Sequence, residues 1–340
     1  PSSPEVALAL DWLVRTQEPD GSWDPAKWDG QPVYRVGLTG LALLALVGSE
    51  EDVTAGRYAG AIARATAFLL SEQKVNGRFG PFFSASVYNH GIATVALLER
   101  YARTRDERLK RPIEEALVFI GRHQDADGGW GYLDPERDAN ASVTAWQLHA
   151  VLLADALGWS QARTSAQKAL AWIESTVDAQ GRAGYSRAGD FRYGPQVPTA
   201  IAAFFLSGKS GGDARGRQVA EALGRLPWEG ARADPPVPNG GEGVDFYRAY
   251  FLTLALGALR GRDDAGLSRT QVRDAAKLAQ LRDEVTGDLV ERQLTEGPDA
   301  GSWDPTDRWS PAGGRVYATA MAALSLQAGT RTTPFAAEPR

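Results

Sequence analysis

Residues that could carry out covalent or metal-dependent chemistry are few in this chain of 340 residues. Cysteine is absent, which excludes thiol nucleophiles and thiolate metal ligands. The histidines, His90, His123 and His149, have neither Glu-x-x-His nor His-x-x-x-His spacing, and no serine lies in a Gly-x-Ser-x-Gly turn. We therefore expect no bound metal, no cofactor and no nucleophile-elbow hydrolase.

The charge balance and the hydropathy exclude two further classes. With 37 basic and 42 acidic residues the net charge is −5, so nucleic acid is not expected as a partner. The longest uncharged stretches, 194–208 and 316–330, are shorter than the ~20 apolar residues that cross a bilayer. The first residues lack the basic and apolar segments of a signal peptide. We expect a soluble domain without a membrane span. Its compartment stays open, including an extracytoplasmic part of a longer protein.

A motif of glutamine, glycine and an aromatic residue recurs with a period of roughly fifty residues, which is typical of stacked supersecondary units. It reads Gln-x3-Gly-x-aromatic in 17–23, 73–79 and 124–130, and weaker or interrupted copies occupy 178–185 and 293–303. We interpret the motif as structural. The glycine would adopt the left-handed turn that ends a helix, and the aromatic ring would pack on the neighbouring hairpin. The glutamine would bind free N–H groups of an adjacent helix start.

The helical patterns come in six pairs of different character, and a copy of the motif lies within each pair except 213–226 and 244–259. The first helices of the pairs are charged on one face: 5–17, 57–73, 110–124, 161–177, 213–226 and 270–293. The second helices are almost uncharged: 36–47, 88–101, 140–157, 197–207, 244–259 and 315–328. Amphipathic helices face water and apolar helices are buried, so six such hairpins predict an all-α (α/α)6 toroid with an outer and an inner ring. We predict one domain over 1–330, with a loop over 229–245 and a C-terminal tail over 331–340.

The Gln-x3-Gly-x-Trp loops resemble the QW repeats of squalene and oxidosqualene cyclases, whose toroid also occurs in protein prenyltransferase β subunits. Segments 88–94, 142–146 and 313–319 resemble the prenyltransferase and squalene oxidase repeat proteins of planctomycetes and myxobacteria. The resemblance covers nearly the whole chain and implies a terpenoid-cyclase-like fold of bacterial type. The acid motif of the cyclases, Asp-x-Asp-Asp, does not occur in the sequence.

The zinc site of the prenyltransferases is matched only in part. The resemblance aligns Asp138-Ala-Asn140 with their Asp-x-Cys ligands and Asp245-Phe-Tyr-Arg248 with their Asp-Phe-Tyr-His motif. Asparagine and a protonated guanidinium stand where sulfur and imidazole would be, so this resemblance predicts no metal site. Arg248 could form an ion pair with Asp138 or hold an anionic ligand, and both interpretations stay open.

In a double ring the starts of the inner helices meet at one central mouth. We expect these side chains there: Tyr34, Arg35, Tyr88, Asn89, His90, Asp138, Asn140, Tyr193, Gln196, Asp245, Tyr247, Arg248, Arg315 and Tyr317. The candidate ligand-binding residues are His90, Asn140, Tyr247, Arg248, Tyr250, Arg315 and Tyr317. For His90 the resemblance implies a place near a bound diphosphate, and the alternative is a buried structural histidine.

The sequence favours a toroid without a metal site that binds a hydrophobic or amphipathic ligand in its central cavity. The ligand would be isoprenoid-like, lipid-like or a peptide, and we expect a monomer. One alternative is an enzyme acting on isoprenoid substrates, cyclase-like or prenyltransferase-like, with Asp138 or Asp245 as the acid. The other is a structural or interaction domain of a larger envelope or signalling protein.

Overall fold

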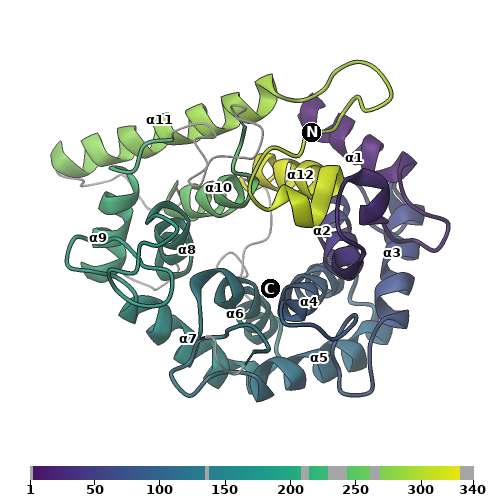
Figure 1. Ribbon diagram of the computed structural model, residues 1–340, viewed down its shortest axis with the longest axis horizontal. Helices are drawn as coiled ribbons and strands as arrows, with labels where there is room; N and C mark the ends of the chain where they lie inside the picture. Colours follow the sequence, from purple (N-terminus) through teal and green to yellow (C-terminus); the bar gives the residue numbers. More distant parts are fainter. Residues whose placement is uncertain (1–2, 135–137, 208–213, 229–242, 261–268, 330–340) are drawn as a thin grey trace.

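Two concentric rings of helices make up the molecule (Figure 1). The computed structural model describes residues 3–134, 138–207, 214–228, 243–260 and 269–329. Over these ranges the chain forms α-helices, short 3-10 turns and isolated β-bridges, and no β-strand. The prediction of an all-α (α/α)6 toroid is confirmed. Most of the predicted loop, residues 229–242, and the predicted tail lie outside the described residues.

Outer and inner helices alternate along the chain, as predicted. The outer ring contains α1 (Pro4–Arg15), α3 (Ala59–Ser71), α5 (Lys110–Arg122), α7 (Arg163–Ser175), α9 (Ala214–Leu223) and α11 (Arg269–Glu291). The inner ring contains α2 (Arg35–Val47), α4 (Ser86–Thr104), α6 (Ala141–Ala156), α8 (Gln196–Ser207), α10 (Phe246–Arg260) and α12 (Ser310–Leu326). Among the described helices, none combines the length and hydropathy that a bilayer crossing requires.

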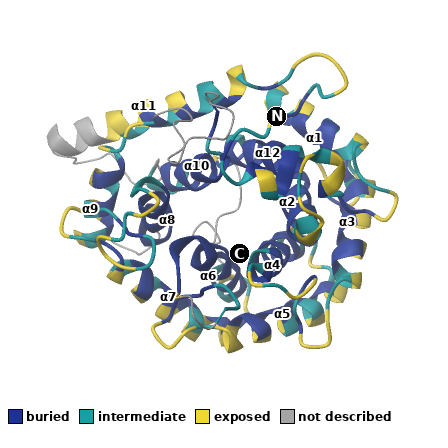
Figure 2. Ribbon diagram, viewed as in Figure 1, coloured by how far each residue is buried: buried dark blue, intermediate teal, exposed yellow. Residues whose placement is uncertain are grey.

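The two rings differ in how they are buried (Figure 2). Helix α5 buries only the face that carries Ile113, Leu117 and Ile120, and its other residues meet water. Every residue of α2 from Val36 to Val47 is buried. An amphipathic helix can face solvent, whereas a helix that is apolar on all sides must be enclosed. The outer ring therefore covers the inner ring, whose starts are left to form the site.

The repeated glutamines join neighbouring outer helices. The Gln17 Nε2 group donates to the carbonyl oxygen of Gly21 in its own loop at 3.0 Å and to that of Ala61 at 2.9 Å. Gln73 and Gln124 repeat both hydrogen bonds one hairpin further along. The prediction that glutamine binds free N–H groups was wrong, because the amide group donates to carbonyl oxygens instead. Each carbonyl has a second lone pair available for such a bond.

The ring closes through the last copy of the motif. The Gln293 Nε2 group donates to the Gly301 carbonyl at 3.0 Å and to the Glu5 carbonyl at 2.8 Å, which ties the loop after α11 to α1. Gly301 has φ 96°, and a Cβ there would overlap the Leu8 carbonyl oxygen. Glycine is thus needed for its backbone conformation and for the close approach of α1.

Helix α12 begins earlier than predicted. It includes a break at Gly314, where φ is 61°, so one extra turn precedes the regular helix that the sequence places from residue 315. A Cβ at Gly314 would overlap the Trp28 carbonyl oxygen. The extra turn brings Trp309, directly before α12, to the edge of the central cavity.

Candidate functional site

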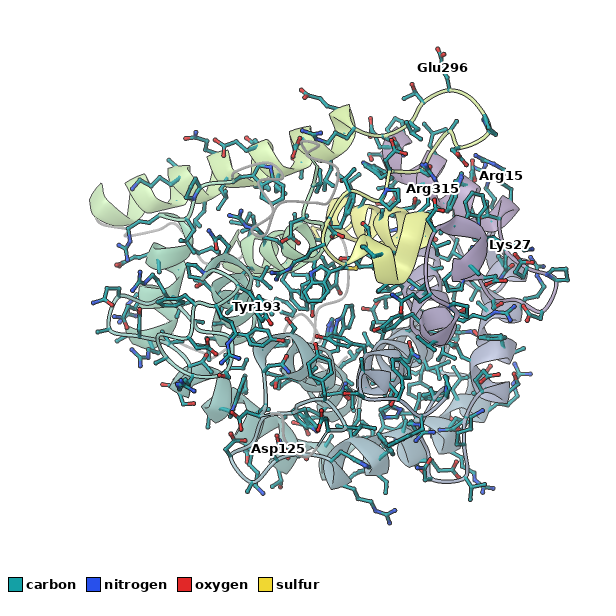
Figure 3. The ribbon with its side chains drawn as sticks, in the orientation of Figure 1. Arg15, Lys27, Asp125, Tyr193, Glu296 and Arg315 are labelled. Atoms are coloured by element: carbon teal, nitrogen blue, oxygen red, sulfur yellow. The ribbon has the colours of Figure 1, made fainter. Side chains whose placement is uncertain are left out.

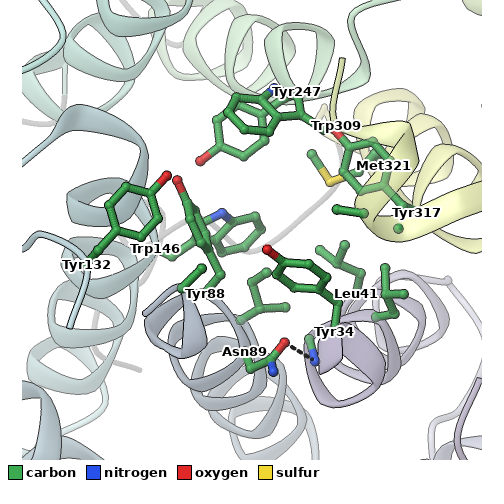
Figure 4. Close-up of a pocket in the computed structure, with 16 residues that line it drawn as sticks. Tyr34, Leu41, Tyr88, Asn89, Tyr132, Trp146, Tyr247, Trp309, Tyr317 and Met321 are labelled. Carbon is green, nitrogen blue, oxygen red and sulfur yellow. Dashed lines mark hydrogen bonds between the residues drawn. The ribbon is translucent and has the colours of Figure 1, made fainter. Parts of the chain in front are cut away.

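A central cavity opens between the starts of α2, α4, α6, α10 and α12 (Figure 4). Its volume is about 720 Å³, including the space at its open mouth. The lining residues are Tyr34, Gly37, Leu38, Leu41, Ala85, Tyr88, Asn89, Ile92, Tyr132, Trp146, Tyr247, Trp309, Ala312, Gly313, Tyr317 and Met321. The cavity therefore has an aromatic wall, made by the tyrosines and tryptophans of this list, and an apolar remainder.

The aromatic wall is electrically neutral. Burial raises the pKa of Tyr88, Tyr247 and Tyr317 well above the ordinary value for tyrosine, so these phenols stay protonated at physiological pH. The Tyr247 hydroxyl donates to the Ser142 carbonyl oxygen at 3.0 Å. The Tyr317 hydroxyl donates to the Asp307 carboxylate at 3.1 Å. Both hydroxyl protons are directed to the protein, which fixes the two rings in place.

Few polar groups of the wall remain for a ligand. The Asn89 side chain accepts from the Gly37 N–H at 3.0 Å and donates to the Val33 carbonyl at 2.7 Å, so it links α2 to α4. The Trp309 indole N–H is buried and has no acceptor among the described residues. A bound molecule with one oxygen in reach of this N–H would satisfy it.

Asp307 lies behind the aromatic wall, 1% exposed. Its carboxylate accepts from the Phe246 N–H at 3.1 Å, the Ser310 N–H at 2.8 Å and the Tyr317 hydroxyl. Burial and the neighbouring Asp245 carboxylate raise the pKa of Asp307 to about 7, although the hydrogen bonds from Ser310 and Tyr317 act in the opposite direction. Asp307 thus joins the starts of α10 and α12 and contacts two lining residues, the Tyr317 hydroxyl and the backbone N–H of Trp309.

The two predicted acids do not line the cavity. Asp138 is exposed to solvent. Asp245 is half-buried directly before α10 and accepts from the Arg248 N–H at 2.9 Å, the hydrogen bond of a helix cap. Neither carboxylate is placed to protonate a molecule in the cavity.

Arg248 is turned away from the cavity. Its guanidinium donates to the Pro227 carbonyl oxygen at 2.6 Å and lies 5.1 Å from the centre of a Trp228 ring. Among the ion pairs of the described residues, none joins Arg248 to Asp138, so that predicted pair is not formed. A helix turns by about 100° per residue, so Tyr247 facing the cavity directs the next side chain elsewhere.

Arg315, predicted as a ligand-binding residue, holds a loop and does not line the cavity. Its guanidinium donates to the Ser302 hydroxyl at 3.1 Å and to Asp304 at 2.6 Å. Arg35 makes the equivalent bond to Ser22 in the first repeat and pairs with another carboxylate of that loop, Asp20. Figure 3 places Arg315 beside Arg15, away from the centre of the ring. The recurrence marks this arginine as part of the repeat.

His90 is also part of the repeat. The backbone N–H of Trp23, Trp130 and Trp303 donates to a threonine hydroxyl of the following inner helix. In the second repeat the Phe79 N–H donates instead to His90 Nδ1 at 3.2 Å, and His90 Nε2 pairs with the Ala116 carbonyl at 3.2 Å. Burial lowers the pKa of His90 to about 3, so the imidazole is neutral. The structural interpretation of His90 fits these contacts, and the imidazole does not line the cavity.

The other two candidates support the site without lining it. Asn140 caps α6, where its side-chain oxygen accepts from the Val143 N–H at 3.0 Å. Tyr250 is completely buried, and its ring stacks on Trp146 at 5.5 Å between centres. Of the seven predicted ligand-binding residues, Tyr247 and Tyr317 line the cavity.

Sequence reasoning missed Tyr132, Trp146 and Trp309 as lining residues. Trp146 lies in an apolar run, and such a run does not distinguish a cavity wall from the core, although Trp146 is within the first two turns of α6. Trp309 was missed because the break at Gly314 hides the first turn of α12. Tyr132 follows a repeated loop, and no spacing rule places it at the mouth.

The described residues contain no group of three or more histidine, aspartate or glutamate side chains that could hold a metal ion. Asp307 and Asp245 are neighbours, but both are engaged in helix starts. Nothing in this geometry calls for a cofactor, and the sequence-based expectation of none remains a prediction.

Comparisons with known proteins bear on the fold. No family model and no curated protein matches the chain. Among solved structures, an inactive α-1,6-mannanase of Salegentibacter sp. HEL1_6 has a TM-score of 0.67 at 13% identity over 96% of this chain and 98% of that chain. The type II terpene cyclase MstE from Scytonema gives 0.63 at 16% identity over 95% and 96%. An unsaturated glucuronyl hydrolase specific for heparin gives 0.64 at 14% identity over 96% and 95%. The chain is therefore similar in fold to terpene cyclases and glycoside hydrolases built on the (α/α)6 toroid.

Proposed function

We propose that the chain binds a hydrophobic or amphipathic small molecule in its central cavity. The observation that carries the proposal is the wall, where five tyrosines and two tryptophans surround an apolar remainder that includes Leu41, Ile92 and Met321. The cavity is open to solvent at its mouth, so a bound molecule need not lie wholly inside it. Burying a flat or chain-like apolar molecule against these rings would supply most of the binding free energy.

The composition of the wall argues against two other ligand classes. A diphosphate needs cationic side chains, and no described lining residue is an arginine, lysine or histidine. A sugar needs many hydrogen bonds, whereas Asn89 is already paired with Gly37 and Val33. The cavity fits an apolar body with few polar atoms better than either class.

One structural neighbour supports this ligand class. A variant of the terpene cyclase MstE, solved with its substrate geranylgeranyl dihydroxybenzoate, has a TM-score of 0.60 at 14% identity. That molecule has a long isoprenoid body and one polar end. An isoprenoid-like or lipid-like ligand in the present cavity would have the same division of character. Peptide binding, a structural role and the monomeric state remain predictions from the sequence.

An enzyme acting on isoprenoid substrates is the second candidate. It is favoured by one observation, the hydrogen bond that connects the buried Asp307 carboxyl to Tyr317 in the wall. A carboxyl group with a pKa near 7 can give up a proton at neutral pH. Incubation with geranylgeraniol followed by extraction and mass analysis distinguishes the two functions. Recovery of unchanged alcohol supports binding alone, and a cyclised product supports catalysis.

The binding proposal is tested by titrating the protein with geranylgeraniol while following tryptophan fluorescence. We expect saturable binding with one molecule per chain. The variant Ala85→Trp places a large ring at the cavity edge and should weaken binding at least tenfold.

A matched control adds the same side chain elsewhere. Val75 is fully exposed in the loop after α3, so Val75→Trp should bind like the unmodified protein. Equal affinity in Ala85→Trp and Val75→Trp would contradict the proposed site. Native mass spectrometry of the purified protein, followed by solvent extraction, would show which molecule it carries from the cell.

A further inference from the structure

The wall of the cavity has an unusual electrostatic character for an apolar pocket. Seven of the described lining residues carry tyrosine or tryptophan rings, and none carries a charged group. Such rings present a negative face and a positive edge. A cation over these faces, within about 6 Å of the ring centre, is attracted, and the attraction grows when water is excluded.

We infer that the ligand carries a cationic head group, which is a quaternary or protonated amine. This inference rests on the proposed function. The head group lies among the rings of Tyr34, Tyr88 and Trp146, which Figure 4 shows around the open space. Its apolar body extends over Leu41 and Ile92.

Hydrogen bonding makes parts of the wall more electron-rich. The Tyr247 hydroxyl donates its proton to the Ser142 carbonyl, and the Tyr317 hydroxyl donates to Asp307. A phenol that donates a hydrogen bond gains electron density on its oxygen and ring, because the bonds of a chain polarise one another. When it is ionised, the Asp307 carboxyl behind Tyr317 adds negative potential at Tyr317.

A protein cation already uses one ring of the wall in this way. The Arg308 guanidinium lies 4.7 Å from the centre of Trp309, although Arg308 itself does not line the cavity. Its charge would repel a second cation nearby. We therefore place the head group nearer to Tyr88 and Trp146 than to Trp309.

Two probes of the same shape test the charge alone. Hexanoylcholine carries a trimethylammonium group, and 3,3-dimethylbutyl hexanoate carries a neutral tert-butyl group in its place. Isothermal titration should show that the cationic ester binds at least tenfold more tightly, a difference of about 1.4 kcal/mol. Addition of 1 M NaCl should leave most of this preference, because a cation–ring contact at close range is screened less than an attraction between distant charges.

The outcomes separate this inference from the proposed function. If the neutral ester binds as tightly as the cationic one, the cation preference is wrong and the apolar cavity stands. If neither ester binds, and geranylgeraniol does not bind either, both proposals fail.

Two substitutions at Tyr88 test whether this ring is responsible for the preference for the cationic ester. Tyr88→Leu should reduce the ratio between the two esters at least threefold, because it removes a ring but keeps an apolar side chain. Tyr88→Phe should keep most of the preference, since the ring remains. A similar ratio in Tyr88→Leu and the unmodified protein would remove Tyr88 from the site. Circular dichroism melting of each variant checks that it is folded.

Discussion

The loops of the repeat and the wall of the cavity use the same residue types in opposite ways. In the loops, the indole N–H groups of Trp23, Trp130 and Trp303 each donate to a backbone carbonyl of the preceding outer helix. In the wall, the Trp309 N–H finds no acceptor among the described residues. The three indoles of the repeated motif are thus hydrogen-bonded within the protein, whereas the Trp309 indole N–H of the wall is left for a ligand.

The loops and the wall also differ in whether their residues recur from one hairpin to the next. Arg35 and Arg315 occupy equivalent places and make equivalent bonds, as the glutamines do. Tyr88 and Tyr247 line the cavity without such a counterpart in every hairpin. The repeated residues thus build the ring, and the site is formed where the hairpins differ. Substitutions in the two regions should affect different quantities.

The largest effect should come from the loop that closes the ring. Gly301→Ala places a Cβ against the Leu8 carbonyl at a positive φ, and we expect a loss of about 3 kcal/mol in the free energy of unfolding. Gly297→Ala is the matched control, because φ is 80° there and no atom lies within 4 Å of the added Cβ. It should cost about 1 kcal/mol. Urea unfolding measures both, and equal losses would show that the contact with α1 does not matter.

Substituting one tryptophan of the loops and one of the wall compares the two regions directly. Trp303→Phe removes the 2.7 Å hydrogen bond to the Leu289 carbonyl and should lower stability by about 1–2 kcal/mol. Trp309→Phe removes an N–H without an acceptor and should change stability by less than about 0.5 kcal/mol, while lowering ligand affinity. Chemical denaturation and ligand titration of both variants give the two quantities. A large stability loss in Trp309→Phe would mean that its ring is structural.

Sequence periodicity predicted the ring well because burial controls it. The alternation of charged and uncharged helices determines which helix faces water, and that pattern needs no side-chain detail. The residues of the site were harder to predict, because the direction of each side chain depends on its exact position along the turn of its helix. His90 and Arg315 each lie two residues from a tyrosine that faces the cavity, Tyr88 and Tyr317, and two residues turn a side chain by about 200°.

Asp307 shows a second reason why parts of the site could not be predicted from the sequence. Its role depends on the starts of α10 and α12 meeting in space, and these lie more than 60 residues apart in the chain. No local motif marks such a contact. The place of Trp309 could not be predicted for a related reason, because the non-helical Gly314 separates the first turn of α12, which Trp309 precedes, from the regular helix.

A smaller effect should appear when the medium is acidified. Unfolded His90 has the ordinary pKa of 6.5, and the folded value is about 3, so unfolding takes up a proton between these values. The histidine should therefore destabilise the protein as the pH falls below 6.5, by about 2 kcal/mol at pH 5. His90→Thr inserts the residue that the other repeats use and should remove this part of the pH dependence. His123→Gln should retain it, and the difference between the two unfolding curves isolates the buried imidazole.

The smallest expected effect concerns the pH dependence of ligand binding. Asp307 has a pKa of about 7, raised by burial and by Asp245 from the start of α10, and its carboxyl accepts hydrogen bonds from Ser310 and from Tyr317 of the wall. Raising the pH from 6 to 8 deprotonates the carboxyl, and its added negative charge should attract a cation in the cavity. Affinity for hexanoylcholine should rise about threefold, in keeping with a charge pair partly shielded by Tyr317. The neutral ester should bind equally at both pH values. If both esters show the same rise, the carboxylate acts on the shape of the wall, since charge alone would favour only the cationic ester.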